Sequence, residues 1–298
     1  MEKWVKFARQ NGFAEFPPDA KQFSSYITTL SEQGASFTTI KLLQSSMPFY
    51  YAARDSEALV VTKRRYVKQI LGGALRKAAQ DKGPVRKAVT FGEEEIKSFL
   101  TSVFWSTGSR NNPNPSLKDW RTATRLYTYY FTLCRFDCYS KLKKNSIEFF
   151  DDHVVIKYPT RKNDQLYSGS QSVLKLRDDP LCPKLIFKTY FKIMQFKSDS
   201  DTLNCRLSFN GKTSRPTTQL AYSQALKDTK KLTESFGYDG VTEKSFKASG
   251  VTVLLDKNTT LHDVQVYGGW KSLETPMYYH NSSIKRRKEV STALINKS

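Results

Sequence analysis

A strand-turn-strand pattern lies in the middle of a chain whose other periodic segments are mainly helical. Residues 146–150 and 153–158 are rich in β-branched and aromatic side chains, and they flank the turn dipeptide Asp151-Asp152. Residues 172–176 have the composition of a third strand. We therefore predict an α+β fold that is mainly helical and contains a small antiparallel sheet.

The N-terminal part of the chain predicts helices joined by polar connections. In residues 20–33 apolar side chains recur at i, i+3, i+4 and i+7, and Gly34 follows as a stop. Those apolar positions are Phe23, Tyr26, Ile27 and Leu30. Ser36 can cap a second helix, which Pro48 is expected to interrupt.

A third predicted helix, residues 63–79, combines an apolar face with a cationic one. The apolar positions are Val67, Ile70, Leu71 and Leu75. The cationic side chains are Lys63, Arg64, Arg65, Lys68, Arg76 and Lys77. One face of this helix is expected to pack, and the other to remain cationic.

Gly83-Pro84 breaks the helical pattern, and residues 80–88 contain no periodic apolar set. This stretch therefore predicts a basic linker between two domains. The expected boundaries are an N-terminal helical domain over residues 1–82, a linker over 83–89 and a second, mixed α/β domain over 90–298.

The second domain is expected to begin with a helix. Thr90 and Glu93 have the spacing of a capping box, and an amphipathic pattern follows them. A long aromatic helix is predicted over residues 118–134. From Pro183 onward the pattern is mostly helical, except for a turn around Asn210-Gly211.

The charge of the chain indicates a polyanionic partner. The chain carries 48 Lys and Arg against 28 Asp and Glu, which gives a formal net charge of +20. Since no apolar run approaches the roughly 20 residues that span a bilayer, and the N-terminus lacks a signal-peptide core, we expect neither membrane insertion nor secretion. Charge alone does not separate DNA-binding from RNA-binding proteins, because phosphate attraction depends little on the sugar.

The four cysteines are too few and too irregularly spaced for a disulfide framework. Cys134 and Cys138 lie in an apolar stretch with helical periodicity and lack the paired spacing of zinc ligands. We therefore expect buried, reduced thiols.

Four short clusters hold the side chains that could perform chemistry. Each places cationic or aromatic polar side chains at the end or the start of a predicted element. In chain order they are residues 133–142 with Arg135, residues 160–165 with Arg161 and Lys162, residues 242–250 with Lys244 and Lys247, and residues 268–280 with Trp270, Tyr278, Tyr279 and His280.

In this order the clusters resemble the catalytic domain of the tyrosine recombinases, the phage-integrase-like family, and particularly its divergent forms in eukaryotic mobile elements. The resemblance covers residues 90 to 285, and the N-terminal helical region is similar to the family's core-binding domain. Trp270 and Tyr279 are nine positions apart, the separation that the family shows between its His or Trp and its nucleophile.

The resemblance assigns a role to each position. Arg135 resembles the family's first catalytic arginine, and Lys162 the lysine of the β-hairpin. Lys244 stands where the family often has His or Lys, and Trp270 where it has His or Trp. Lys247 stands where the family has its second arginine, which is a departure from the pattern.

The resemblance also implies a reaction. The phenol of Tyr279 attacks a phosphodiester, a 3′-phosphotyrosyl intermediate forms and the 5′-hydroxyl leaves, so that no metal or nucleotide cofactor is expected. Arg135 would stabilise the charge on the non-bridging oxygens with a planar pair of donors. Lys162 would protonate the departing oxygen. Trp270 would donate its indole N–H or pack the nucleophile's helix.

Each assignment has an alternative. Arg135 could be a structural charge paired with Asp137 or another acid, and Lys162 could be a solvated turn lysine. Lys244 and Lys247 are one helical turn apart and are expected to share a face, which suits phosphate contact or solvation as well as catalysis.

The tyrosine pair is resolved by geometry. Adjacent helical residues diverge by about 100°, so Tyr278 and Tyr279 cannot both face one phosphate. The spacing to Trp270 selects Tyr279, while Tyr278 is expected to pack and His280 to be incidental.

Lys247 keeps two functions open, because lysine cannot reproduce the bidentate contact of arginine with a phosphate. The first is a site-specific recombinase or integrase that cleaves and rejoins DNA. The second is a catalytically impaired or inactive DNA-binding protein derived from such an enzyme. A third, more remote function is that of an RNA-binding or chromatin-associated protein with a coincidental motif order, in which Arg135, Lys162 and Tyr279 would lie far apart.

Double-stranded DNA is the expected partner, held by the two domains as a C-shaped clamp. Residues 284–296 predict a tail helix that packs on its own domain or on a neighbouring protomer in a homo-tetramer on DNA. We expect a nuclear protein if the source is eukaryotic and a cytoplasmic one otherwise. The residues expected to contact DNA are Lys63, Arg64, Arg65, Arg76, Lys77, Arg86, Lys87 and Arg161.

Overall fold

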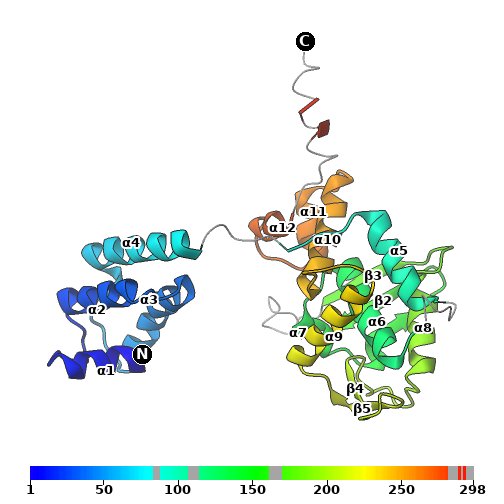
Figure 1. The fold of residues 1–298 in the computed structure, drawn as a ribbon, viewed down its shortest axis with the longest axis horizontal. Helices are drawn as coiled ribbons and strands as arrows, with labels where there is room; N and C mark the ends of the chain where they lie inside the picture. Colours follow the sequence, from blue (N-terminus) through cyan, green and yellow to red (C-terminus); the bar gives the residue numbers. More distant parts are fainter. Residues whose placement is uncertain (83–87, 107–113, 161–169, 281–287, 290, 293–298) are drawn as a thin grey trace. The chain divides into compact units, whose positions relative to one another are not determined.

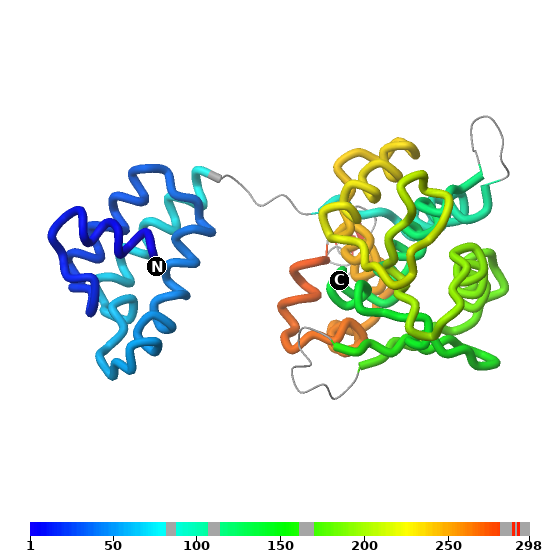
Figure 2. Tube along the Cα trace, turned by 90° about the horizontal axis from the view of Figure 1, so that it is seen from below, coloured from blue at the N-terminus to red at the C-terminus, as the bar shows by residue number. Residues whose placement is uncertain are grey.

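The computed structural model describes residues 1–82, 88–106, 114–160, 170–280, 288–289 and 291–292. The chain divides into two compact units, Met1–Arg86 and Lys87–Ser298. Figures 1 and 2 show unit 1 in blue to cyan and unit 2 in cyan to red. Within the described residues no helix has both the length and the apolar character that crossing a bilayer requires.

Unit 1 is entirely helical in its described part. Its elements are α1 (Glu2–Gln10), α2 (Ala20–Glu32), α3 (Phe37–Ala52), the 3₁₀ turn η1 (Val61–Lys63) and α4 (Arg65–Lys82). Asp19 caps α2 and Ser36 caps α3 by accepting backbone N–H groups. A core around the fully buried Trp4 and Phe23 joins these helices.

Two predicted boundaries in unit 1 were wrong. Pro48 does not interrupt its helix, since α3 continues to Ala52. Tyr50 and Tyr51 beyond it are buried in the core, and this packing outweighs the loss of one backbone donor. The third helix begins at Arg65 and extends to Lys82, which makes the start of the predicted linker helical.

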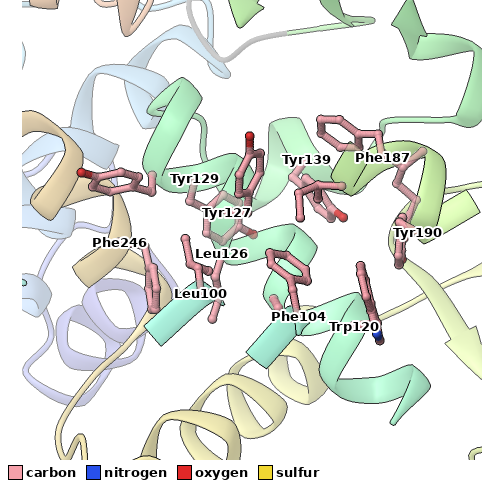
Figure 3. Close-up of a cluster of buried hydrophobic side chains, with 14 of the residues drawn as sticks. Leu100, Phe104, Trp120, Leu126, Tyr127, Tyr129, Tyr139, Phe187, Tyr190 and Phe246 are labelled. Atoms are coloured by element: carbon pink, nitrogen blue, oxygen red, sulfur yellow. The ribbon is translucent and has the colours of Figure 1, made fainter. Parts of the chain in front are cut away.

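Unit 2 is built around α6 (Leu117–Thr132), in which every residue from Trp120 to Tyr130 is buried. A helix that is buried all round must have neighbours on all sides. These include α5 (Glu93–Phe104), α8 (Pro183–Ile193), α9 (Tyr222–Ser235) and α10 (Glu243–Asp256). Figure 3 shows the resulting core, in which Tyr127 of α6 lies among rings from other helices, such as Phe187 of α8 and Phe246 of α10.

The three-stranded sheet has the order β1-β2-β3 and is antiparallel throughout. Its strands are β1 (Ile147–Phe149), β2 (His153–Tyr158) and β3 (Ser170–Lys175). The prediction of a mainly helical fold with a small antiparallel sheet is therefore confirmed.

Two details of unit 2 differ from the prediction. The cap of α5 is Gly92, whose N–H donates to Glu95, and Thr90 lies outside the helix. The turn at Asn210-Gly211 belongs to a second hairpin that was not predicted, formed by β4 (Cys205–Leu207) and β5 (Ser214–Gln219). β5 contains Pro216 and mostly polar side chains, so it lacks the apolar alternation that reveals a strand.

The chain after α10 carries the predicted catalytic residues Trp270 and Tyr279. It contains α11 (Leu261–Tyr267) and the short α12 (Glu274–Tyr279). Figures 1 and 2 show α10, α11 and α12 side by side, and all three pairs of helices are in contact.

Candidate active site

Three of the predicted residues meet at one point of unit 2. The Nζ of Lys247 lies 4.5 Å from the ring centroid of Trp270 and 5.1 Å from that of Tyr279. The two rings are stacked, with centroids 5.9 Å apart and planes 19° from parallel. Lys247 is 4% exposed and Trp270 5% exposed, whereas Tyr279 is half-buried. An ammonium group over aromatic faces is a cation–π arrangement.

Tyr279 is the last residue of α12. His280 caps that helix, and its Nε2 lies 3.4 Å from Oδ1 of Asp256, the last residue of α10. This contact joins the ends of the helices that carry Lys247 and Tyr279. His280 is thus an anchoring residue, which the sequence pattern did not indicate.

Trp270 is held by the chain just before it. Its backbone N–H donates to the carbonyl of Gln265 at 3.0 Å, and the Gln265 side chain donates back to the Trp270 carbonyl at 3.1 Å. A Cβ at Gly268 would lie 2.4 Å from the indole ring, so this position accepts only glycine without a shift. Among the described residues, the buried Nε1 of Trp270 has no hydrogen-bond acceptor.

Arg135 is the N-cap of α7 (Phe136–Ser140), one break beyond α6. It is half-buried, and its guanidinium has no hydrogen bond or ion pair among the residues that the structure describes. The alternative pairing with Asp137 is wrong, because Asp137 pairs with Lys141 at 3.1 Å. A half-buried cation without a protein partner is suited to binding an anion.

A residue between α6 and α7, Leu133, packs against Trp270 and lies two positions before Arg135. Leu133, which ends α6 in the left-handed conformation at φ 53°, is fully buried in a small core with Val251 and Trp270. The position one turn beyond Lys247, Gly250, lies so close to α6 that a Cβ there would be 2.4 Å from the Tyr130 carbonyl oxygen. These contacts bring the chain before Arg135 close to α10.

The lysines predicted on one helix face have different environments. Lys244 is exposed in the first turn of α10, and Lys247 is buried against the two rings. The interpretation of Lys247 as a solvated side chain is therefore wrong. Tyr278 does not pack in the core either, since it is 68% exposed and contacts the edge of Tyr279.

Lys162 and Arg161 lie outside the described residues, as do Arg86, Lys87 and the greater part of the predicted tail helix. The strand that leads to Lys162 is described to its end. There the Nζ of Lys141, just after α7, donates to the Thr160 side chain at 2.9 Å. The end of β2 is thereby tied to the helix that Arg135 caps.

The remaining residues predicted to contact DNA lie on unit 1 and are all exposed. Lys63 and Arg64 precede α4. On α4 itself, Arg65 and Arg76 lie on the face turned away from the buried Val67, because helical residues advance by about 100°. Lys77 lies to one side of this cationic face.

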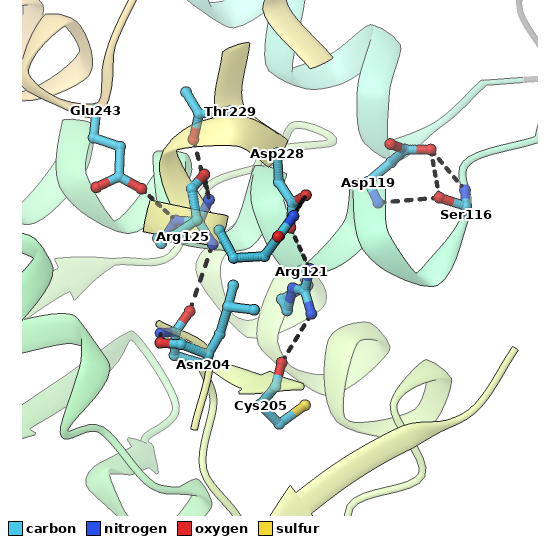
Figure 4. Close-up of polar contacts among 12 residues, drawn as sticks. Ser116, Asp119, Arg121, Arg125, Asn204, Cys205, Asp228, Thr229 and Glu243 are labelled. Atoms are coloured by element: carbon cyan, nitrogen blue, oxygen red, sulfur yellow. Dashed lines mark hydrogen bonds and ion pairs between the residues drawn. The ribbon is translucent and has the colours of Figure 1, made fainter. Parts of the chain in front are cut away.

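Two buried arginines on α6 were missed by sequence reasoning (Figure 4). Arg121 pairs with Asp228 at 2.5 Å and donates to the Cys205 carbonyl. Arg125 lies 3.0 Å from Glu243 and donates to Thr229 and to the Ala225 carbonyl. Burial raises the pKa of Glu243, and the adjacent Arg125 guanidinium opposes that rise.

These arginines link α6 to α9 and to the first residue of α10. Each is paired with a buried carboxylate and donates to a backbone carbonyl, so they are structural groups. Their sequence signal is a pair of cations one turn apart in a helix that is otherwise aromatic and small, where solvated charges are not expected.

The described cysteines agree with the sequence prediction. Cys134, Cys138 and Cys205 are buried, Cys182 is half-buried, and none of the four forms a disulfide in the part of the chain that the structure describes. Burial raises the pKa of Cys205 to about 11, which disfavours its thiolate.

Comparisons with known proteins were made for sequence and for fold. No protein-family model matches the chain, and no curated protein matches it in sequence. Among solved structures, the chain is similar to the XerH site-specific recombinase bound to palindromic difH substrate in a post-cleavage complex, with 15% identity and a TM-score of 0.60 over 93% of this chain and 72% of that one.

Two further structures are similar over nearly the whole chain. The Tn1549 transposon integrase in complex with circular intermediate DNA is 11% identical, with a TM-score of 0.56 over 98% of this chain and 92% of that one. A lambda integrase dimer bound to a COC′ core site is 13% identical, with a TM-score of 0.54 over 94% and 70%. The protein therefore has the fold of the tyrosine recombinases.

Proposed function

We propose that the protein is a DNA-binding site-specific recombinase or integrase that cleaves and rejoins DNA through a 3′-phosphotyrosyl intermediate on Tyr279. The observation that carries this proposal is the convergence of Lys247, Trp270 and Tyr279 in a chain with this fold. The motif order supports assignment to the divergent type found in eukaryotic mobile elements.

In the proposed reaction the Tyr279 phenol attacks a backbone phosphate, a bond forms between its oxygen and phosphorus, and the bond to the 5′-oxygen breaks. Arg135, without a protein partner among the described residues, would bind the non-bridging oxygens. The unsatisfied N–H of Trp270 would supply a further donor. Lys162 would protonate the departing 5′-oxygen, a role that rests on the resemblance alone.

The cationic surface of α4 and the residues before it would hold duplex DNA through phosphates, with unit 2 completing the contact. Assembly as a homo-tetramer on DNA, with the tail helix packed on a neighbouring protomer, belongs to the same proposal. A nuclear site of action is proposed if the source is eukaryotic.

One observation favours the second candidate function, a DNA-binding protein that has lost cleavage. The ammonium of Lys247 faces two ring surfaces, and lysine offers a phosphate no planar pair of donors. Losing one such interaction at a transition state costs on the order of 10²-fold or more in rate.

The central test is formation of a covalent adduct. The full chain is incubated with nicked duplexes that trap the intermediate, and protein-linked DNA is detected on a denaturing gel. Tyr279→Phe should abolish the adduct, because it lacks the attacking oxygen. Tyr278→Phe is the matched control and should retain it. An adduct that persists in Tyr279→Phe excludes this nucleophile.

Lys247→Arg separates the two candidate functions. The substitution should raise adduct formation by about 10-fold or more, since it restores a bidentate donor, and should leave DNA affinity within about twofold. Lys231→Arg, at an exposed position of α9 with no assigned role, is the control and should change neither. If Lys247→Arg lowers both cleavage and affinity, the assignment of this position to the second arginine is wrong.

A further inference from the structure

The hairpin β4–β5 has a charge pattern that the proposed reaction does not use. Residues 202–227 contain four Lys and Arg and no Asp or Glu. Arg206 and Arg215 are direct partners in the antiparallel register, and both are exposed. Like charges placed opposite each other destabilise a strand pair, so an anion between them would relieve the repulsion.

The two arginines have no competing partner within the protein. Among the described residues, neither guanidinium makes a hydrogen bond or an ion pair. The turn of the hairpin adds Lys212, which is also exposed and equally without a partner there. The hairpin therefore presents three cations whose donors remain available for phosphate oxygens.

The tip of the hairpin adds an aromatic ring that is held in solvent. Phe209 is fully exposed. The turn around it is fixed, because Asn210 accepts from the Ser208 hydroxyl at 2.6 Å and from the Lys212 N–H at 3.1 Å, and Ser208 donates to the Thr213 carbonyl. An exposed ring on an ordered turn beside cations is the combination that binds an unpaired base and its phosphate.

The hairpin also borders an open hollow of about 520 Å³. The buried pair of Arg121 and Asp228 lines it, and the Nε of Arg121 has no acceptor among the described residues. Lys118, Arg206 and Phe209 line it as well. The hollow is thus cationic and large enough to receive part of a nucleotide.

We infer that the β4–β5 hairpin is a second nucleic-acid site, in which Arg206 and Arg215 hold a backbone phosphate and Phe209 stacks on an unpaired base of a single strand. Figure 1 shows the hairpin at the end of unit 2 opposite α11 and α12, so the site is distinct from the cluster around Tyr279. The inference does not depend on strand cleavage.

The test uses the full chain saturated with unlabelled duplex, so that the proposed duplex-binding surface is occupied. A labelled single strand of mixed sequence is then added, and its binding is followed by fluorescence anisotropy. The wild type should form the ternary complex. Phe209→Ala should weaken single-strand binding by about 5- to 100-fold through loss of stacking.

The charge variant is Arg206→Gln/Arg215→Gln. It should weaken single-strand binding and reduce the slope of log affinity against log salt by about 1.4, because two phosphate contacts are lost. The control is Lys192→Gln/Lys197→Gln, which removes the same charge from exposed positions on or just after α8. It should leave both quantities nearly unchanged.

Two results would overturn the inference. The first is that duplex displaces the labelled strand from the wild type, and that the hairpin variants and the control variant bind the strand with equal affinity. The hairpin would then not be a separate site. In a second arm the labelled strand is replaced by a labelled blunt duplex. If the hairpin variants weaken only this duplex, the surface binds intact DNA through phosphates and the stacking role of Phe209 is wrong.

Discussion

Arg125 and Lys247 are both buried cations of unit 2, but their surroundings differ. Arg125 lies 3.0 Å from a carboxylate and donates to two further oxygens. Lys247 lies against the faces of Trp270 and Tyr279. A cation with a buried carboxylate partner is tied to the folded state, whereas ring faces hold a cation with weaker and less directional forces. The Arg125 pair holds α6 against α10, whereas Lys247 places a positive charge beside Tyr279.

The largest expected effect comes from removing the buried pair of Arg125 and Glu243. Arg125→Met should lower the free energy of unfolding by about 3–5 kcal/mol at pH 7, because Glu243 is left as a buried, unpaired charge. Urea unfolding measures the loss. The exposed pair of Lys230 and Glu234 supplies the control, and Lys230→Met should cost less than about 1 kcal/mol.

The same variant should depend on pH in a defined direction. Burial raises the pKa of Glu243, and removal of Arg125 takes away a group that lowers it. A folded-state pKa above the unfolded value means that stability falls as pH rises from the unfolded value through the folded one. The defect of Arg125→Met should therefore be smaller at pH 5 than at pH 7. An equal loss at both values would contradict a buried carboxylate as its cause.

An intermediate effect is expected where α10 touches α6. Gly250→Ala should cost about 1–3 kcal/mol, since the new methyl group would meet the Tyr130 carbonyl and Leu133. Gly73→Ala in α4 is the control. No atom lies within 4 Å of its added Cβ, and it should stabilise by about 0.4–1 kcal/mol. Equal effects at both glycines would mean that the helices do not approach closely at Gly250.

The smallest effect on the free energy of unfolding is expected for Lys247, which lies against two aromatic rings. Lys247→Met keeps the length of the side chain and its packing against the two rings, and it removes cation–π contacts worth about 1 kcal/mol. The free energy of unfolding should fall by about that amount. A loss as large as that of Arg125→Met would place Lys247 among the structural cations.

The elements with strong periodicity were predictable from the sequence. The helix now seen as α2 and the hairpin of β1 and β2 followed from side-chain spacing and turn residues. The proximity of Trp270 and Tyr279 is also local in the sequence, because Trp270 shortly precedes α12 and Tyr279 is the last residue of that helix. Such local patterns carry their structural meaning within a few residues.

The features that depend on tertiary contacts were not predictable. α3 passes through Pro48 because two tyrosines beyond it are buried. The aromatic sequence around Arg121 and Arg125 indicates that they are buried, but it does not reveal their partners, because α9 and α10 supply the acids about 100 residues later. The exposure of Lys244 and the burial of Lys247 likewise depend on which rings pack against α10.

The left-handed Leu133 has a consequence for how this end of the molecule responds to substitution. Its side chain shares a small core with the Trp270 indole, and its backbone is two residues from Arg135. The Leu133 side chain thus meets the indole while its backbone leads to the arginine, so the packing of Trp270 and the placement of Arg135 depend on the same residue. A substitution that moves Leu133 would therefore disturb both.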